Sequence, residues 1–175
     1  MHIELHLPQP PESPPPLRDY DPELDDVRSI LSDVCDWAEP YGIFVVGGFG
    51  QDPWPLDVRT DLLVVLEQLP EALLALSSGA AFEIDFYEQG VERRISFSPN
   101  EGGYAAACLS YGNWRPDPSV EKIDRAALDR MLTAVRDEFL RFIRCSYPGL
   151  ELHPWLVSLH VASAAVGTRP PEPPR

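Results

Sequence analysis

The sequence predicts an α+β domain, in which an antiparallel sheet of about four to six strands carries helices packed on it. Residues 82–87 alternate strictly between apolar and mostly acidic side chains, which is the period of a half-buried strand. Glycine-containing turns at 88–90 and 100–103 separate this segment from two further strand-like segments. A stripe of apolar residues at spacings of three and four then runs through 124–145, as in a helix with one buried face.

The N-terminal quarter is expected to form a short strand and a helix. Residues 2–7 alternate, with Ile3, Leu5 and Leu7 on one face. Asp21 is a suitable N-cap, and Pro22 suits the first turn because its missing N–H is not needed there. Apolar residues at helical spacing continue from there, so a helix is predicted over 21–38.

A buried strand is expected next, at Ile43–Val46, because the run is apolar and β-branched. The glycines of 47–50 predict a tight turn at its end rather than a phosphate-binding loop, because neither glycine-rich phosphate motif is present. Residues 62–66 form a continuous apolar run that periodicity cannot assign. A strand is the preferred interpretation, followed by a short helix near 70–78 that ends at Gly79.

The segment 82–111 is expected to form a three-stranded meander with Phe82, Ile84 and Phe86 buried. Arg93 falls on the inward-facing side of the second strand, so a bulge or an edge position is expected there. The last element that the pattern assigns is the helix over 124–145. Residues 150–166 are apolar but give no clear element type.

Proline usage suggests the domain organisation. The chain contains 20 prolines among 175 residues, concentrated partly at both ends, and proline donates no hydrogen bond to a helix or a central strand. We expect a short strand and proline-rich linker over 1–18, one α+β domain over 19–166, and a disordered proline-rich tail over 167–175. A proline-rich ligand for another domain is the alternative interpretation of such segments.

The cysteines and the N-terminus indicate the compartment. Three widely spaced cysteines, Cys35, Cys108 and Cys145, cannot all pair within one chain, and their apolar or helical contexts suit buried free thiols. A reducing compartment follows. The first residues lack a basic flank and a long apolar run, and no segment approaches the roughly 20 apolar residues of a membrane span. A cytoplasmic protein without membrane contact is therefore expected.

The formal charge of −14 comes from one part of the sequence. Between Asp19 and Gly90 there are 16 acidic residues and only two arginines, whereas the rest of the chain has equal numbers of acids and bases. Such an excess repels nucleic-acid phosphates, so no nucleic-acid partner is expected. It attracts basic proteins, although acidic surfaces also serve only for solubility.

No catalytic, cofactor or metal-binding pattern is present. His2, His6, His153 and His160 lack carboxylates or cysteines at zinc-site spacing, and Cys145, at the end of an amphipathic helix, is expected in the core. Glu83 and Asp85 share a strand face as paired carboxylates do in acid–base catalysis. Their setting favours contact with solvent or a partner instead.

Two tryptophans, Trp54 and Trp114, lie in proline-bounded loops. Such residues either plug the edge of a core or anchor an interface, where tryptophan is a common hot spot. With the acidic residues around them they form the candidate partner interface. Its members are Asp52, Trp54, Asp57, Glu83, Asp85, Tyr87, Glu88 and Trp114.

The chain resembles the small immunity proteins of bacterial polymorphic-toxin and contact-dependent inhibition systems. The resemblance covers roughly residues 40–145 and rests on Trp54-Pro55, the run 61–65, the segment 82–90, and Trp114 before the last long helix. It implies a non-enzymatic cytosolic protein without cofactor that neutralises one toxin by tight binding, here through an acidic surface facing a basic toxin domain. The alternatives are a small-molecule enzyme or ligand-binding domain using a cleft beside Trp54, and a secretion chaperone or adaptor.

Overall fold

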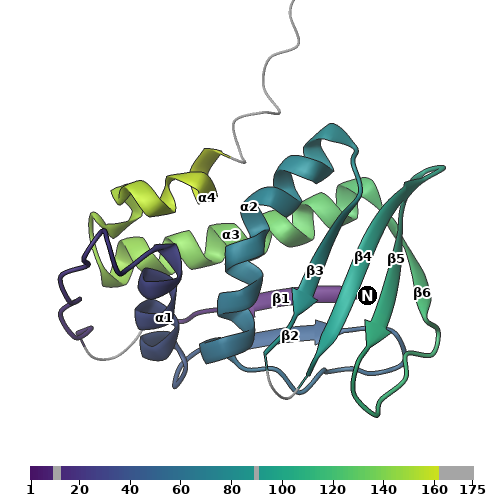
Figure 1. Ribbon diagram of the computed structural model, residues 1–175, viewed down its shortest axis with the longest axis horizontal. Helices are drawn as coiled ribbons and strands as arrows, with labels where there is room; N and C mark the ends of the chain where they lie inside the picture. Colours follow the sequence, from purple (N-terminus) through teal and green to yellow (C-terminus); the bar gives the residue numbers. More distant parts are fainter. Residues whose placement is uncertain (10–12, 89–90, 162–175) are drawn as a thin grey trace, which may run out of the picture.

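The computed structural model describes residues 1–9, 13–88 and 91–161, and in this part of the chain two antiparallel sheets are packed with helices in an α+β fold (Figure 1). The expected fold class is confirmed. None of the helices in these ranges is both long and apolar enough to cross a membrane. The expected tail at 167–175 lies outside the described residues.

The strands form two sheets rather than the single sheet expected. The two-stranded sheet pairs β1 with β2, and the other sheet has the order β3-β4-β5-β6. The bounds are β1 His2–His6, β2 Ile43–Gly47, β3 Phe82–Phe86, β4 Arg93–Asn100, β5 Gly103–Ser110 and β6 Val120–Asp124. The predicted meander is present as β3, β4 and β5, with Ile84 and Phe86 fully buried and Phe82 partly buried. Strand β6 was not expected.

The helices agree with the sequence at the C-terminal end and differ from it elsewhere. Their bounds are α1 Val27–Ala38, α2 Leu63–Ser78, α3 Arg125–Ser146 and α4 Val157–Val161, with single turns η1 Val58–Leu62, η2 Leu150–Leu152 and η3 Pro154–Leu156. The helix predicted over 124–145 is confirmed as α3, with Asp124 as its N-cap. Beyond it, the residues up to 161 that had no assigned type form η2, η3 and α4.

Helix α1 begins six residues later than predicted. The carboxylate of Asp26 accepts hydrogen bonds from the N–H groups of Arg28 and Ser29, so Asp26 is the N-cap. Asp21 instead accepts from the N–H of Glu23 at 2.9 Å within a separate turn. Both aspartates are good capping residues, and the sequence did not show which one the tertiary structure uses.

The strand expected at 62–66 is wrong, because these residues belong to η1 and to the start of α2. Helix α2 runs through Pro70, whose missing N–H removes one backbone hydrogen bond inside the helix. Most of the helix is buried, including Leu63 to Leu66, Leu69, Ala72, Leu73 and Leu76. A helix that is apolar on nearly every side has no amphipathic period, which explains the wrong assignment.

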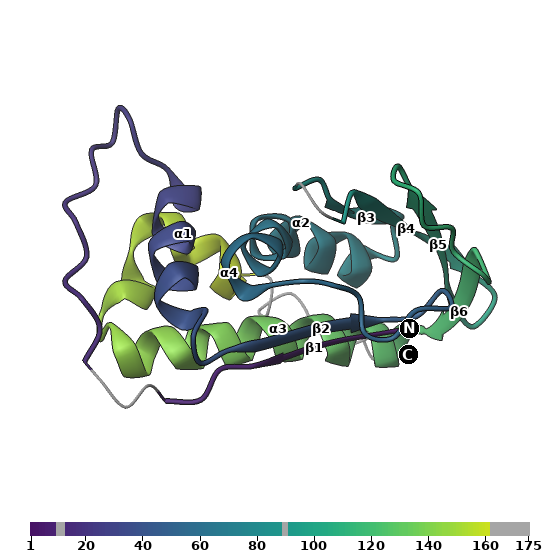
Figure 2. The same cartoon turned by 90° about the horizontal axis from the view of Figure 1, so that it is seen from below.

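Helix α2 lies at the centre of the molecule. It contacts α1, α3, α4 and strand β3, while α3 runs along the two-stranded sheet (Figure 2). The four-stranded sheet stands at one end, and α1 stands at the other (Figure 1). The core is therefore one cluster that extends from Ile30 on α1 to Ile95 on β4.

The side chain of Gln68 on α2 pairs with the free edge of β3. Its amide Nε2 donates to the carbonyl of Asp85 at 3.0 Å, and its Oε1 accepts from the N–H of Asp85 at 2.9 Å. The amide thus satisfies both backbone groups as a neighbouring strand would. Unpaired edge strands invite pairing with another chain, so α2 protects this edge.

We predict that Gln68→Ala lowers the free energy of unfolding by about 1–3 kcal/mol, because it leaves the backbone groups of Asp85 without their partner. Urea denaturation measures the change. Glu71→Ala, an exposed substitution on the same helix, should change stability by less than about 0.5 kcal/mol. Equal effects of the two substitutions would contradict the pairing role of Gln68.

Candidate functional site

The four-stranded sheet has one face covered by helices and one face open. Alternation places Ile84, Ile95 and Cys108 on the covered side, where α2 and α3 lie (Figure 2). The opposite side chains form what we call the outer face. It consists of Glu83 and Asp85 on β3, Arg94, Ser96 and Ser98 on β4, Ala105, Ala107 and Leu109 on β5, and Val120 and Lys122 on β6.

The middle of the outer face carries small side chains, and exposed apolar side chains lie beside them. The strand register aligns Glu83, Ser96, Ala107 and Val120 in one row, so small side chains occupy the middle. Leu109 is 53% exposed, Val120 is 51% exposed, and Tyr111, just beyond β5, is 55% exposed. Large apolar side chains grouped on an open surface are typical of interaction sites.

Acidic groups border this face on the β3 side, and arginines hold them in place. Arg94 donates two hydrogen bonds to one carboxylate oxygen of Asp85, at 2.9 and 2.6 Å. The carboxylate of Glu83 lies 3.7 Å from the same guanidinium. Because Glu83 is the more exposed of the two acids, it has more freedom to meet a partner.

A second arginine-centred network continues the border after β3. Arg28 on α1 lies 2.6 Å from the carboxylates of both Glu67 and Glu88. The hydroxyl of Tyr87 donates to Glu67 at 2.8 Å and accepts from Arg28 at 2.6 Å. Burial, followed by the hydrogen bond to Glu67, raises the pKa of Tyr87. Four of the eight predicted interface residues, Glu83, Asp85, Tyr87 and Glu88, thus lie along one border.

The two tryptophans lie behind the sheet, away from the outer face. Trp54 is only 2% exposed. It packs against Phe49, Phe86 and Trp114, and its Nε1 donates to the carbonyl of Gly48 at 3.2 Å. Of the two interpretations that the sequence left open, the core plug is the one that fits Trp54. Its side chain has almost no surface to offer a partner.

Arg93 explains why both tryptophans fold inward. Its guanidinium carbon lies 4.5 Å from the ring centre of Trp54 and 3.7 Å from that of Trp114, so cation–π attraction holds the three together. Its Nη2 donates to the Gln51 side chain at 2.7 Å, while Nε and Nη1 have no hydrogen-bond partner among the described residues. Burial lowers the pKa of Arg93.

The bulge or edge position expected at Arg93 is wrong. Strand β4 pairs on both sides, with Arg93 opposite Phe86 and Ser110, and Arg93 is 4% exposed. The alternation in the sequence placed Arg93 on the inward-facing side of the strand, and this correctly indicated a buried arginine. The space beside Trp54, where a ligand cleft was the alternative, is occupied by Arg93 and Trp114.

The remaining two predicted interface residues lie elsewhere. Asp52 is exposed, and its carboxylate lies 3.4 Å from Nε2 of His2. Asp57 is the N-cap of η1, accepting from the N–H of Thr60 at 2.6 Å and of Asp61 at 3.2 Å. Several acids of the charged segment thus cap helical turns. The sequence alone did not distinguish these capping acids from acids that only charge the surface.

Asp61, which the sequence did not single out, is a buried carboxylate. It is 6% exposed and accepts from the N–H of Asp57 at 3.0 Å. Burial, with the charges of Asp57, Glu88 and Glu39, raises the pKa of Asp61 to about 6. Its place beside the capping Asp57, just before an apolar run, was the only signal available in the sequence.

The three cysteines are free thiols, as expected. Cys35 and Cys108 are buried, and burial is the main cause that raises the pKa of each. Cys145 is exposed, so its expected core position is wrong. Within residues 1–9, 13–88 and 91–161, no group of three or more His, Cys, Asp and Glu side chains lies close enough to hold a metal ion.

Comparisons with protein-family models, curated proteins and solved structures gave no match.

We predict that Trp54→Ala lowers the free energy of unfolding by about 3–5 kcal/mol, the usual cost of removing a buried large aromatic side chain. Trp114→Ala should cost less, because Trp114 is only partly buried. Chemical denaturation of both variants measures the difference. A stable Trp54→Ala protein would show that this side chain is not part of the core.

A second prediction concerns Asp61. Its folded pKa lies above its ordinary value of 3.8, so the ionised form destabilises the folded state, and this contribution to stability improves as pH falls from above 6 towards 4. Asp61→Asn should therefore raise the free energy of unfolding at pH 7.5 by about 2–3 kcal/mol.

The gain from Asp61→Asn should disappear near pH 4, where the parent carboxyl is protonated. Urea denaturation between pH 4 and 8 measures the profile. Glu71→Gln, which alters an exposed carboxylate on α2, should change stability by less than about 0.5 kcal/mol throughout this range. A stability gain for Asp61→Asn that is the same at all pH values would contradict the raised pKa.

Proposed function

We propose that this protein is a non-enzymatic binding domain that takes a basic partner protein on the outer face of its four-stranded sheet. The observation that carries the proposal is the open face itself, with a small-residue centre, exposed Leu109 and Val120, and acidic groups along β3. Exposed apolar groups supply binding energy. The acids favour a partner of positive charge.

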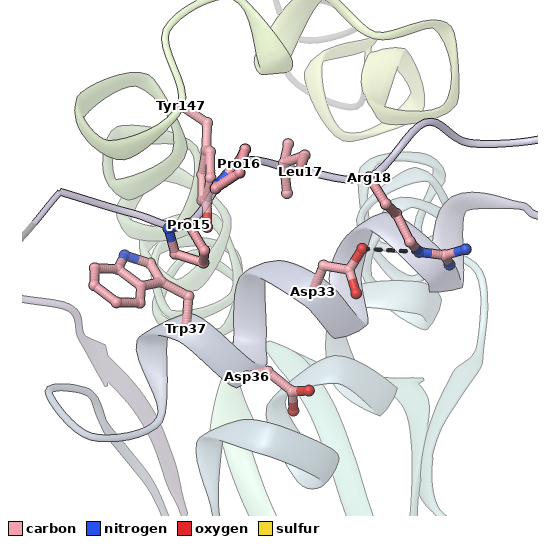
Figure 3. Close-up of a pocket in the computed structure, with 8 residues that line it drawn as sticks. All are labelled: Pro15, Pro16, Leu17, Arg18, Asp33, Asp36, Trp37 and Tyr147. Carbon is pink, nitrogen blue, oxygen red and sulfur yellow. Dashed lines mark hydrogen bonds and ion pairs between the residues drawn. The ribbon is translucent and has the colours of Figure 1, made fainter.

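A protein fits this face better than a small molecule does. Small ligands are usually held in concave pockets that bury most of their surface. The outer face instead consists of side chains projecting from a regular sheet, and the hollows lined by residues 14–18, one of which is shown in Figure 3, lie at the α1 end of the molecule. A broad surface that combines exposed apolar side chains with charged side chains at its border is typical of a protein interface.

The overall charge supports a basic partner and opposes nucleic acid. The chain carries a formal charge of −14, all of it arising between Asp19 and Gly90. A negative field accelerates encounter with positively charged proteins and repels phosphates. Because Arg28 and Arg94 neutralise much of the charge beside the outer face, we infer that charge chiefly guides the approach and apolar contact sustains the complex.

The biological role that we propose is neutralisation of a bacterial toxin in the cytoplasm. It rests on the resemblance to immunity proteins and on this acidic, open surface. In such a role the protein acts by occupying the toxin, without catalytic chemistry or cofactor. Residues Glu83, Asp85, Tyr87 and Glu88 are retained as interface residues, and Leu109 and Val120 are added from the structure. In this proposal Trp54 and Trp114 pack behind the sheet and do not contact the partner.

The test uses a basic toxin domain encoded beside this gene and measures binding kinetics and protection of cells. We predict that Leu109→Arg weakens the complex at least tenfold, mainly by faster dissociation, because it breaks the apolar contact and adds a like charge. Leu152→Arg is the matched control, since Leu152 is also exposed (75%) and lies on η2, which packs against α3. Equal loss in both variants would place the interface elsewhere.

The contribution of charge is measured separately in the same system. Glu83→Lys should slow association at low salt and lose this effect at high salt, where charges are screened. Glu71→Lys makes the same charge change on α2, away from the outer face, and should have the smaller effect. An unrelated small basic protein should bind weakly throughout. Binding as tight as that of the toxin domain would show attraction without a specific interface.

A further inference from the structure

The two edges of the four-stranded sheet differ in how their backbone groups are paired. At the β3 edge, the side chain of Gln68 pairs with the backbone of Asp85, and α2 packs against the strand. Strand β6 is the other edge, and within the described residues it pairs with β5 alone. Figure 1 shows β6 as the outermost strand at that end of the molecule. The sheet therefore has one protected edge and one open edge.

The backbone of β6 carries hydrogen-bonding groups that face away from the sheet. The N–H of Cys108 on β5 donates to the carbonyl of Ser119 at 2.9 Å. Antiparallel strands exchange hydrogen bonds at every second residue, so the odd-numbered residues of β6 bond to β5 in this register. The N–H and C=O groups of Val120 and Lys122 point outward and have no hydrogen-bond partner in the described part of the chain. Such a row of unpaired groups is a template for another strand.

The side chains beside this edge are accessible. Val120 is 51% exposed, and Lys122 and Asp124 are exposed as well. Lys122 is the only lysine of the chain, and its ammonium group forms no ion pair with the residues that the structure describes. Val120 and Lys122 lie two residues apart on the outer face. An added strand would therefore meet one apolar side chain and one unpaired cation on the same face.

The charge of β6 opposes pairing with a second copy of this chain. Antiparallel pairing of β6 with itself over its full length centres on Lys122, and it would place Lys122 directly opposite Lys122. Like charges that face each other across two strands are destabilising, and a lysine on an edge strand is a known protection against self-pairing. The formal charge of −14 on each molecule adds general repulsion. The open edge thus excludes its own copy and suits a strand of opposite charge.

We propose that β6 binds an extended segment of the partner protein by strand addition, with an acidic side chain beside Lys122 and an apolar side chain beside Val120. Main-chain hydrogen bonds supply affinity in this mode of recognition, and alternate side chains supply specificity. The proposal rests on the proposed function, because the partner is the one that occupies the outer face. Val120 belongs to both surfaces, so one protein can contact the face and the edge together.

Strand addition also fixes how the partner lies on the outer face. Glu83 and Asp85 border this face on the β3 side, and Lys122 borders it on the β6 side. The partner then presents basic groups over β3 and an acidic strand at β6. Reversing the partner would bring like charges together at both borders, which is costly. Lys122 is therefore a specificity-determining residue of the interface.

The first test uses the synthetic peptide acetyl-Thr-Val-Thr-Glu-Thr-Val-Thr-amide. Its sequence is the same in both directions, so glutamate lies beside Lys122 and valine beside Val120 whichever way the peptide pairs. We expect saturable downfield NMR shifts of the Val120 and Lys122 amide protons, because both gain hydrogen bonds. A peptide with lysine in place of glutamate should bind there roughly threefold more weakly or worse. Absence of saturable shifts at these two amides would overturn the proposal.

Variants of Lys122 separate the charge from the backbone bond. Lys122→Glu should reverse the preference between the two peptides, an outcome that general loss of structure cannot produce. Lys122→Pro removes the outward N–H, and proline is tolerated where an edge strand faces solvent. It should weaken binding of the glutamate peptide about three- to tenfold more than Lys122→Ala does, with similar urea midpoints. Equal binding by these two variants would contradict backbone pairing.

The toxin domain of the preceding test decides whether one partner uses both surfaces. We expect Lys122→Pro to speed dissociation of that complex more than Lys122→Ala does, in addition to the effect of Leu109→Arg. If Leu109→Arg weakens the complex and Lys122→Pro does not, the outer face binds the partner and strand addition is wrong. If only Lys122→Pro weakens it, the edge is the site and the outer face is wrong. Light scattering that shows a dimer of the parent, lost in Lys122→Pro, would identify a second copy as the occupant and overturn the proposal.

Discussion

Burial of α2 is the constraint on which the rest of the structure depends. The helix contacts α1, α3, α4 and β3, and its apolar residues are distributed almost all round it. Such a helix is stable only when other elements surround it, because any apolar side chain left exposed would lose the free energy gained on burial. The sheet and the other helices thus form a shell around α2. The shell also explains why Pro70 is tolerated, since tertiary packing compensates for one lost backbone hydrogen bond.

The two ends of the shell have different physical characters. At the sheet end, the inner side chains complete the core, and the outer side chains are small, apolar or charged and remain open. At the α1 end, a proline segment lies loosely over aromatic and acidic groups, some of which have no hydrogen-bond partner among the described residues. The open sheet surface is the one that suits a folded partner, and it lies at the end opposite α1 (Figure 1).

The negative charge has two roles that the structure distinguishes. Asp26 and Asp57 cap helical turns, and Asp61 is buried beside the second cap. Glu67, Glu83, Asp85 and Glu88 are instead gathered around Arg28 and Arg94 at the surface. Capping carboxylates stabilise the fold by accepting backbone hydrogen bonds, whereas the surface groups contribute little to stability and remain available for steering. The high acidic content is therefore partly a requirement of folding.

The sequence by itself determined the α+β class, the meander and the last long helix, because alternation over 82–87 and helical spacing over 124–145 are local patterns with distinct periods. It also placed Glu83 and Asp85 on one strand face and marked Arg93 as inward. Only the tertiary structure decided that 62–66 is helical, that Asp26 rather than Asp21 caps α1, and that Trp54 is buried around Arg93 while Leu109 and Val120 stay open. These features depend on which surfaces meet across long sequence separations, and neither local propensity nor charge carries that information.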